Sequence, residues 1–330
     1  MRGKIPDYYS EFACIGSRCR NNCCIGWEID IDPDSLKWYM AAAGDFGDRL
    51  AQGISMEDVP HFRTDHDGRC VFLNQENLCD IYIQMGEDAL CDICTQHPRF
   101  HHDCGGIRES GLGIACEEAG RLILDRQSPV IFMEHGPFSS DETVDFLLNV
   151  REQVFHLLQN RGISMKERFN MALAYGRQAQ DLMNTDCLEI AELNSMRNED
   201  LLEKLSAPQE REFWLAFFQD LDIMDDRWRT CLEKASRCSE NNLNFEDTFW
   251  EQLMIYFVFR HLTAAADDYN IHGKIRFCVL SCLIIRWILN AVTNEKHAMT
   301  RMDIAGLYSR EIEYSEENLH AVWDELLFDS

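Results

Sequence analysis

Residues 14–27, CIGSRCRNNCCIGW, decide how this chain of 330 residues is organised. Their thiols are spaced C-x4-C-x3-C-C, and ten of the fifteen cysteines in the chain lie before residue 120. A thiolate is a soft ligand, and four of them close around a zinc ion or an iron-sulfur cluster when tight turns bring distant segments together. Gly16, Gly26 and the Asn21-Asn22 pair supply such turns. The clustering therefore predicts a bound metal.

Two other interpretations of the cysteines compete with metal binding. A secreted disulfide framework is disfavoured because the chain opens MRGKIPDYYS, without an apolar signal segment. Ordinary buried thiols explain the clustered cysteines poorly. That interpretation suits the scattered ones, Cys187, Cys231, Cys238, Cys278 and Cys282.

The spacing leaves the kind of metal open. A zinc ribbon shows two CxxC knuckles, and only Cys91-Asp-Ile-Cys94 has that form here. The CxxxCxxC loop of radical S-adenosylmethionine enzymes is absent. Cys19 and Cys23 start this pattern, but its third position falls on Gly26. The vicinal pair Cys23-Cys24 supplies either one ligand and one core thiol or a bridge between two layers of ligands. Four histidines lie among the cysteines as candidate nitrogen ligands, although each alone is more often a polar surface residue: His66, His97, His101 and His102.

Composition narrows the class of protein. The chain is 46% apolar, which is enough for a large core, and its formal net charge is −26 with no basic tract. Nucleic acid and anionic membranes are therefore disfavoured as partners, and the acidity indicates solubility more than steering of a cationic substrate. The most apolar run, 277–289, is shorter than a bilayer span and contains Arg286, so we expect a buried helix and a cytoplasmic protein without membrane insertion.

In the first third of the chain we expect short elements around the cysteines. Asp32-Pro33 predicts a helix from residue 33 to about 43, which Gly44 ends, followed by irregular chain over 45–67. Residues 68–79 read as a tight hairpin with a cysteine at each end. A helix interrupted at Gly86 is expected over 80–92, ending before His97-Pro98, with a loop over 100–106. Cys116 opens a further helix, whose N-terminus should lower the pKa of its thiol.

Beyond Pro129 apolar residues recur at three- and four-residue intervals, which predicts seven or eight helices and almost no strand. The aromatic helix 245–268 is interpreted as core rather than as a substrate groove. The predicted fold is mainly α: a small irregular cysteine-rich metal-binding module, residues 1–125, packed on a multi-helix domain, residues 126–330, with possible donor or substrate binding. Glycine-rich nucleotide loops, a G-x-S-x-G elbow and an H-E-x-x-H pair are absent from the sequence.

Several motifs together resemble a known family. They are Phe12-Ala-Cys14-Ile-Gly-Ser-Arg-Cys19, Cys23-Cys24-Ile-Gly-Trp27, Cys70-Val-Phe-Leu, Leu78-Cys79, Cys94-x3-Pro98-Arg99 and Cys116-Glu-Glu-Ala. In these motifs the chain resembles the bacterial flagellin lysine-N-methylases, and its first part is similar to small domains described as zinc- or iron-chelating. The resemblance covers residues 8 to about 124. Over the helical remainder it rests only on chain length and on the helical spacing of apolar residues.

The resemblance implies methylation of flagellin lysines, with S-adenosylmethionine as methyl donor and an iron-sulfur cluster, of the 4Fe-4S type, or zinc as the alternative. It offers eight metal ligands, twice what one cluster needs: Cys14, Cys19, Cys23, Cys24, Cys70, Cys79, Cys94 and Cys116. Cys91 and Cys104 are extra to the family pattern, and Glu117 stands where a proline is expected. Catalytic and donor-binding residues stay unassigned, with Trp27, Tyr8 and Tyr9 as aromatic candidates.

Two other functions remain open from the sequence. The cysteine module also suits a non-catalytic, zinc-stabilised interaction protein or an iron-sulfur redox protein. A methyltransferase binds S-adenosylmethionine, whereas an adaptor holds zinc and ignores the donor, and a redox protein takes up electrons reversibly without methyl transfer.

Overall fold

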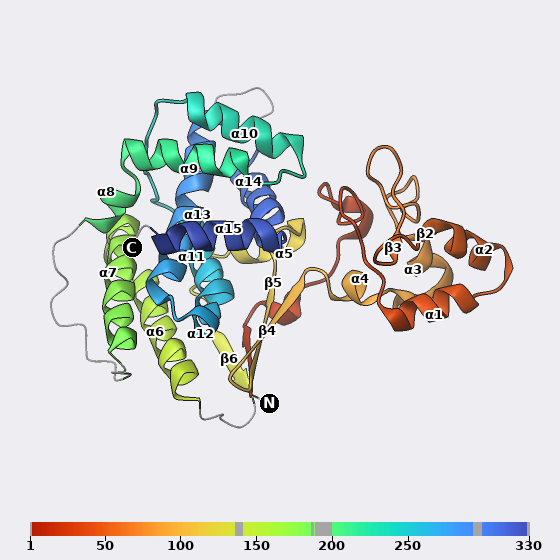
Figure 1. Ribbon diagram of the computed structural model, residues 1–330, viewed down its shortest axis with the longest axis horizontal. Coiled ribbons are helices and arrows are strands. Elements are labelled where there is room, and N and C mark those ends of the chain that lie inside the picture. Colours follow the sequence, from red (N-terminus) through yellow and green to blue (C-terminus); the bar gives the residue numbers. More distant parts are fainter. Residues whose placement is uncertain (1, 136–140, 186–187, 189–199, 293–298, 329–330) are drawn as a thin grey trace.

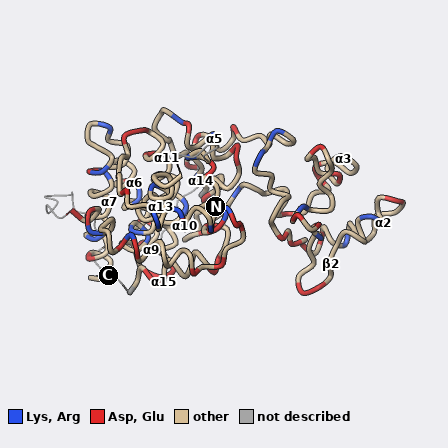
Figure 2. The backbone as a smooth tube through the Cα atoms, turned by 90° about the horizontal axis from the view of Figure 1, so that it is seen from above, with Lys and Arg blue, Asp and Glu red and all other residues tan. Residues whose placement is uncertain are grey.

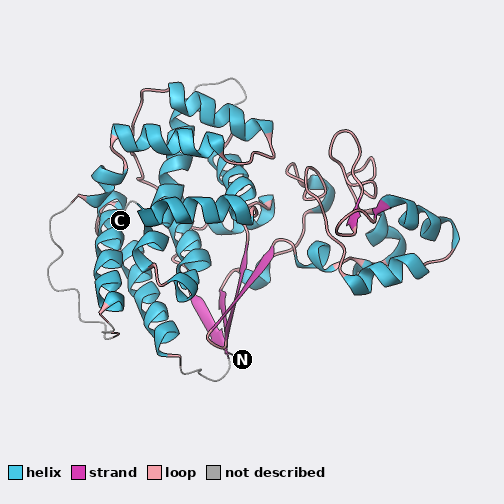
Figure 3. Cartoon of the chain, in the orientation of Figure 1, coloured by secondary structure: helices cyan, strands magenta, loops and turns pink. Residues whose placement is uncertain are grey.

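The computed structural model describes residues 2–135, 141–185, 188, 200–292 and 299–328. It consists of a large helical body and a smaller projecting part, which we call the cysteine lobe, residues 24–97 (Figure 1). The two are joined through residues 13–23, the junction loop, and through the start of β4 at Arg99. The helices dominate both parts, so the predicted mainly helical fold is confirmed (Figure 3).

In the part of the chain that the structure describes, the body contains α5 and, after residue 141, ten further α-helices, more than the seven or eight expected there. Short turns at Leu262–Ala264 and at the π-helical segment Ser309–Glu313 divide runs that read as continuous in the sequence. The helices are α5 (Glu117–Leu124), α6 (Glu142–Leu158), α7 (Met165–Asn184), α8 (Leu201–Leu205), α9 (Pro208–Asp220), α10 (Asp226–Arg237), α11 (Thr248–His261), α12 (Ala265–Asp268), α13 (Ile271–Val292), α14 (Arg301–Tyr308) and α15 (Glu316–Phe328).

Helix α13 is the centre of the body. It contacts α7, α10, α11 and α15, and every side chain from Phe277 to Ile285 is fully buried. The helix is long and apolar enough to cross a membrane, yet 78% of its most apolar window is buried inside the protein. The expected buried helix is therefore confirmed, as is the core role of α11, whose aromatic side chains are buried on all sides.

A four-stranded sheet lies against the helices, where the sequence predicted a loop over 100–106 and almost no strand. Its order is β4 (Arg99–Cys104), β5 (Ile107–Leu112), β1 (Arg2–Pro6) and β6 (Phe132–His135), with β1 parallel to β5 and the other pairs antiparallel. The prediction was wrong because Gly105-Gly106, both with positive φ, form a two-residue hairpin turn between Cys104 and Ile107. The polar histidines of β4 concealed its strand pattern.

The lobe is built from very short elements. They are α1 (Pro33–Ala41), α2 (Gly44–Gly53), β2 (Ile54–Ser55), β3 (His61–Phe62), α3 (Asp80–Met85) and α4 (Asp92–Gln96). Helix α1 starts as predicted, since Asp32 Oδ1 accepts a hydrogen bond from Ser35 N at 2.9 Å. Gly44, however, begins α2 instead of ending α1, and the expected irregular chain was wrong there because Phe46 and Leu50 bury one face of α2 against Phe72.

The predicted hairpin over 68–79 forms only in part. Asn74 makes the tight turn by accepting and donating hydrogen bonds to Leu78, and Cys70 and Cys79 each join a neighbouring segment through a single bridge without a strand. The predicted helix 80–92 divides at Gly86 into α3 and a 3₁₀ turn, and α4 then ends before His97-Pro98 as expected.

Two separate cores result from this chain path. Tyr8, Leu112, Ile114 and Ile123 belong to the same core as the body helices, whereas a second, smaller core lies inside the lobe. Packing thus groups the N-terminal strand, the β4–β5 hairpin and α5 with the helical body, on both sides of the predicted boundary at residue 125.

Candidate functional site

The junction loop carries three cysteines to the start of α5. Cys14, Cys19 and Cys23 lie close enough to Cys116 for their charges to influence one another. We call these four residues the junction quartet. They come from two segments about a hundred residues apart in sequence, and the structure brings them together beside the helical body.

Glu117 fastens the junction loop to α5. Its carboxylate accepts hydrogen bonds from Arg20 N at 2.7 Å, Arg20 Nε at 2.9 Å and Asn21 N at 3.3 Å. Arg20 also reaches Asp303 on α14 at 3.3 Å. A proline at position 117 would lack these contacts, so the departure from the family pattern has a structural role in this chain.

Backbone N–H groups two or three residues further along point at the sulfur atoms of six clustered cysteines. In the quartet, the Gly16 N–H donates to Cys14 Sγ at 3.4 Å and the Asn21 N–H donates to Cys19. Such N–H···S contacts stabilise thiolates and accompany metal ligation. The remaining donors are Phe72 and Leu73 to Cys70, Ile81 and Tyr82 to Cys79, Cys94 to Cys91, and Glu118 and Ala119 to Cys116.

The start of α5 does not lower the pKa of the Cys116 thiol, which corrects one expectation. Burial raises the pKa of Cys116 to about 11, even though the N–H groups of Ala119 and Glu118 oppose the shift. Burial likewise raises the pKa of Cys70 to about 11 and that of Cys19 to about 12. A lowered pKa was predicted for Cys116 from the helix N-terminus alone, and desolvation outweighs that effect.

The six remaining clustered cysteines have different settings. Cys24, Cys70, Cys79 and Cys94, which the sequence predicts as ligands, gather inside the lobe together with Cys91. Cys104 is buried in the body and its Sγ donates to Thr263 O at 3.9 Å, so it is a packing residue. Of the scattered cysteines, Cys187 lies outside the described residues. The fourteen described cysteines are all free, three of the scattered ones being buried as expected: Cys231, Cys278 and Cys282.

The wall beside the quartet is aromatic and cationic. The rings of Trp27 and Tyr314 lie 5.5 Å apart edge to face, and His97 lies 6.0 Å from Tyr314. The Arg310 guanidinium stacks 4.4 Å from the Trp27 ring and donates to Ile25 O at 2.6 Å. Cys23 is close enough to Arg310 for their charges to interact. Trp27 was a sequence-predicted candidate, whereas Tyr8 is buried in the body core.

The pKa of His97 reflects the electrostatics of this wall. Burial, followed by the positive charge of Arg310, lowers the pKa of His97 to about 4. Any cationic amine placed there would be shifted in the same direction, toward its neutral form.

A buried polar network supports the wall from behind. Glu313 accepts hydrogen bonds from His261 Nε2 at 2.6 Å and from Tyr256 Oη at 2.8 Å. Arg260 donates to Tyr256 Oη at 2.7 Å and lies 4.8 Å from the Tyr314 ring. Sequence analysis missed this cluster. Its local signal is the sequence SREIEY at residues 309–314. Three charged side chains there fall in a π-helical turn that is largely buried.

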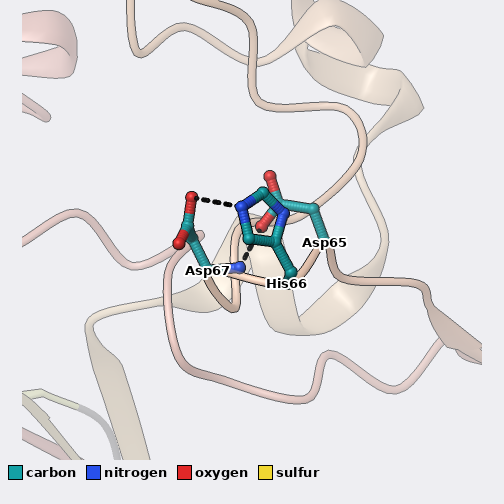
Figure 4. A group of neighbouring side chains, drawn as sticks. All are labelled: Asp65, His66 and Asp67. Carbon is teal, nitrogen blue, oxygen red and sulfur yellow. Dashed lines mark hydrogen bonds and ion pairs between the residues drawn. The ribbon is translucent and has the colours of Figure 1, made fainter.

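A further group of possible metal ligands lies on the surface of the lobe. Asp65, His66 and Asp67 bring donor atoms within 4.8 Å of one another, but all three are exposed and His66 Nε2 lies 3.3 Å from Asp67 (Figure 4). Asp65 accepts from the N–H groups of Asp67 and Arg69, which shapes the turn at this point. His101, another predicted candidate, bonds Ser110 at 2.7 Å on the sheet.

Two cavities lie in the body, away from the quartet. The larger, of about 780 Å³, is lined by residues of α7, α8 and α13 and includes Arg177, Asp181 and Tyr269. Helices α7 and α8 lie on the side of the body opposite the lobe (Figure 1). The second, of about 720 Å³, is lined by residues 161–168 and 242–246. Neither lining contains a clustered cysteine or a residue of the aromatic wall.

Comparison with known proteins identifies relatives for parts of the chain. A family model described as the FliB lysine N-methylase C-terminal domain matches residues 151–329. The flagellar biosynthetic protein FliU of Salmonella muenchen is 27% identical over 145 residues, which cover 41% of this chain and 83% of that protein. A lysine-N-methylase of Salmonella typhimurium strain LT2 is 28% identical over 131 residues, which cover 36% of this chain.

The match spans about a third of the length of that lysine-N-methylase, 32%, and the same figures hold for the lysine-N-methylase of Salmonella choleraesuis. No solved structure is significantly similar to the chain. The family model begins after the last clustered cysteine, so it includes Arg260, Arg310 and Tyr314 of the wall but none of the junction quartet.

Proposed function

The chain belongs to the FliB lysine N-methylase family, whose model covers more than half of its residues, and we propose that it methylates lysine side chains of flagellin with S-adenosylmethionine as methyl donor. The name lysine-N-methylase of one relative supports lysine as the methyl acceptor, and the name flagellar biosynthetic protein of another supports a flagellar protein as the substrate. The observation that carries the proposal is the position of the junction quartet beside a desolvated aromatic wall formed in part by the family domain.

The junction quartet fits an iron-sulfur cluster of the 4Fe-4S type. It offers four thiols, and N–H groups point at three of them, Cys14, Cys19 and Cys116. When bound, a cluster supplies iron that can hold the amino and carboxylate groups of the donor.

Methyl transfer to lysine requires a neutral amine in line with the sulfonium methyl, so that the N–C bond forms as the S–C bond breaks. The half-buried rings of Trp27 and Tyr314 suit both the lysine stem and the sulfonium cation. The charge of Arg310 opposes a second cation beside it, as the lowered pKa of His97 indicates, and so favours loss of the lysine proton.

The test is anaerobic purification, addition of flagellin and S-adenosylmethionine, and mass spectrometry of the flagellin lysines. We expect methylated lysines with the wild-type chain and none with Cys116→Ser, while Cys104→Ala, a packing cysteine of the body, retains activity. Flagellin that stays unmethylated by wild-type protein with its iron and donor bound would overturn the proposal.

Arg310 provides a sharper readout. Arg310→Gln should lower the rate at neutral pH and move the alkaline rise of the pH profile to higher pH, because the substrate amine keeps its proton longer. Arg310→Lys should restore the profile in part. A uniform loss at every pH would show that Arg310 acts on the fold of the junction alone.

A further inference from the structure

Strand β4 forms one edge of the four-stranded sheet, and its outer side is unpaired. Among the described elements β4 pairs only with β5, in a continuous register from Arg99 opposite Leu112 to Cys104 opposite Ile107. In the part of the chain that the structure describes, no backbone–backbone hydrogen bond outside this ladder involves residues 99–104. A free strand edge of this kind is a template for pairing with another extended segment.

Soluble proteins usually block such an edge, and β4 lacks the common devices. Its sequence, RFHHDC, contains neither proline nor lysine, and its pairing with β5 has no bulge. Its two charged side chains are engaged elsewhere. The Arg99 guanidinium lies 5.3 Å from the Phe12 ring, and Arg108 of β5 donates to Asp103 at 2.7 Å. The edge is therefore open to a partner strand.

The hairpin turn decides which backbone groups face this edge. Gly105-Gly106 is a two-residue turn with positive φ at both positions, so Cys104 and Ile107 form the hydrogen-bonded pair that closes the hairpin. Hydrogen-bonded and non-bonded pairs alternate along an antiparallel ladder. His101 and Asp103, both exposed, therefore turn their N–H and C=O groups away from β5 and toward the free edge.

The open end of the β4–β5 hairpin lies at the aromatic wall. The Arg260 guanidinium lies 4.7 Å from the Phe100 ring of β4 and 4.8 Å from the Tyr314 ring of the wall. Gly113, the residue after β5, donates its N–H to Pro98 O at 2.7 Å, directly before β4. Figure 3 shows that β4 comes from the lobe and runs along the body. A strand added to β4 would have one of its ends beside the wall.

We propose that the outer edge of β4 binds an extended, lysine-bearing segment of the protein substrate as an additional strand and so directs the lysine to the wall. The identity of this partner rests on the proposed function. A strand rises about 3.3 Å per residue, so a lysine just beyond the paired segment is carried toward the wall. Main-chain hydrogen bonds supply the recognition, which accepts different sequences around the lysine. The lysine is also opposite in charge to the chain, whose net charge is −26.

Hydrogen exchange at single-residue resolution tests the proposal on the wild-type chain, with monomeric flagellin as the probe. The amides of His101 and Asp103 should exchange rapidly in the free chain and at least tenfold more slowly with flagellin bound. The amides of His102 and Cys104 already bond to β5 and should change little.

The outcomes separate this proposal from the proposed function. Unprotected His101 and Asp103 amides in a chain that methylates flagellin would overturn the docking site and leave the function standing. Protection by flagellin in a chain that transfers no methyl group would support the docking site and overturn the function. Protection without flagellin, in a chain that forms dimers, would assign the edge to a second copy and overturn the proposal.

A proline substitution tests the same edge by kinetics. Asp103→Pro removes one outward N–H and keeps the ladder to β5, because proline is tolerated on an edge strand where its nitrogen faces outward. We expect the KM for flagellin to rise roughly 3- to 10-fold, the net value of one hydrogen bond, with kcat unchanged. Asp103→Ala is the matched control, because it removes the carboxylate and keeps the N–H. Equal changes of KM in the two variants would overturn main-chain recognition, and if Asp103→Pro does not fold, the exchange measurement decides.

Discussion

The helical body and the cysteine lobe hold their folds in different ways. The body surrounds α13 with a continuous apolar core of large side chains, among them Trp214, Trp228 and Trp287. The lobe leaves seven of the twelve most exposed large apolar side chains of the described residues on its surface, too many for its small core to bury. The acidic charge covers both regions (Figure 2) and does not distinguish them. The comparison teaches that apolar burial stabilises the body far more than it stabilises the lobe.

Removal of metal should therefore separate the two regions, and this is the largest effect we expect. Treatment with a strong chelator should leave backbone amides of residues 24–97 exchanging with solvent at close to the unfolded rate, because metal binding by the thiols of a small module contributes directly to its folding free energy. Amides of α11 and α13 should keep their protection. Hydrogen exchange followed by mass spectrometry measures both regions in one experiment.

The control is the same treatment followed by return of the metals. Recovery of protection in the lobe would show that the change is reversible and local. A lobe that stays protected after all zinc and iron have been removed would break the comparison.

The body should instead depend on a buried ion pair. Arg151 donates to both carboxylate oxygens of Glu109, and both side chains are buried between β5 and α6. Arg151→Met should cost about 3–5 kcal/mol, because it leaves Glu109 charged and unpaired in the core. Chemical denaturation of the chain measures the loss, and the zinc and iron content should not change.

The matched control adds Glu109→Gln to Arg151→Met. The second substitution removes the stranded charge while an amide oxygen still accepts from Thr263 Oγ1, which lies 3.2 Å from Glu109. We expect most of the stability to return. A double variant as unstable as the single one would mean that Arg151 acts through packing on Phe155 and Phe259 instead.

The contact between the two regions should respond to a smaller change. A Cβ at Gly113 would stand 2.1 Å from Tyr314 Oη and 2.9 Å from its ring, so Gly113→Ala must displace the tyrosine that packs on Trp27. The expected cost is about 1–3 kcal/mol in thermal unfolding. Gly120→Ala on α5 is the control, because its Cβ meets only Ile114 O at 3.5 Å and alanine favours a helix. Equal effects of the two variants would contradict a tight junction.

The local parts of this structure follow from sequence, whereas the site does not. Asp32 caps α1, and the apolar run of α13 marks a buried helix, because both signals act within a few residues. The β4 strand was missed because its pairing with β5 depends on Gly105-Gly106 and its histidines carry no apolar alternation. The thiols that share a site are likewise set by tertiary packing.

The predicted ligand list shows the same limit. The family resemblance names Cys14 and Cys116 as candidates, but the sequence does not show that they meet, since about a hundred residues separate them. The sequence also does not predict that Arg310, almost three hundred residues further along the chain, packs against the ring of Trp27. Which of the eight cysteines bind metal stays a prediction for the experiments above.

The smallest effect concerns a carboxyl group at the edge of the same junction. Burial raises the pKa of Glu311 to about 7, and its Oε2 accepts from Met224 N at 2.9 Å. A folded pKa above the unfolded one adds stability below the unfolded pKa of about 4.5, and that stability is lost as the pH rises through 7.

Glu311→Gln keeps the acceptor without the charge, so it should match wild type at pH 5 and exceed its free energy of unfolding at pH 8 by about 1 kcal/mol. Thermal unfolding at the two pH values measures this difference, with Glu317→Gln on the exposed face of α15 as the control. An equal gain at both pH values would show that the glutamine improves packing and that Glu311 does not titrate in this range.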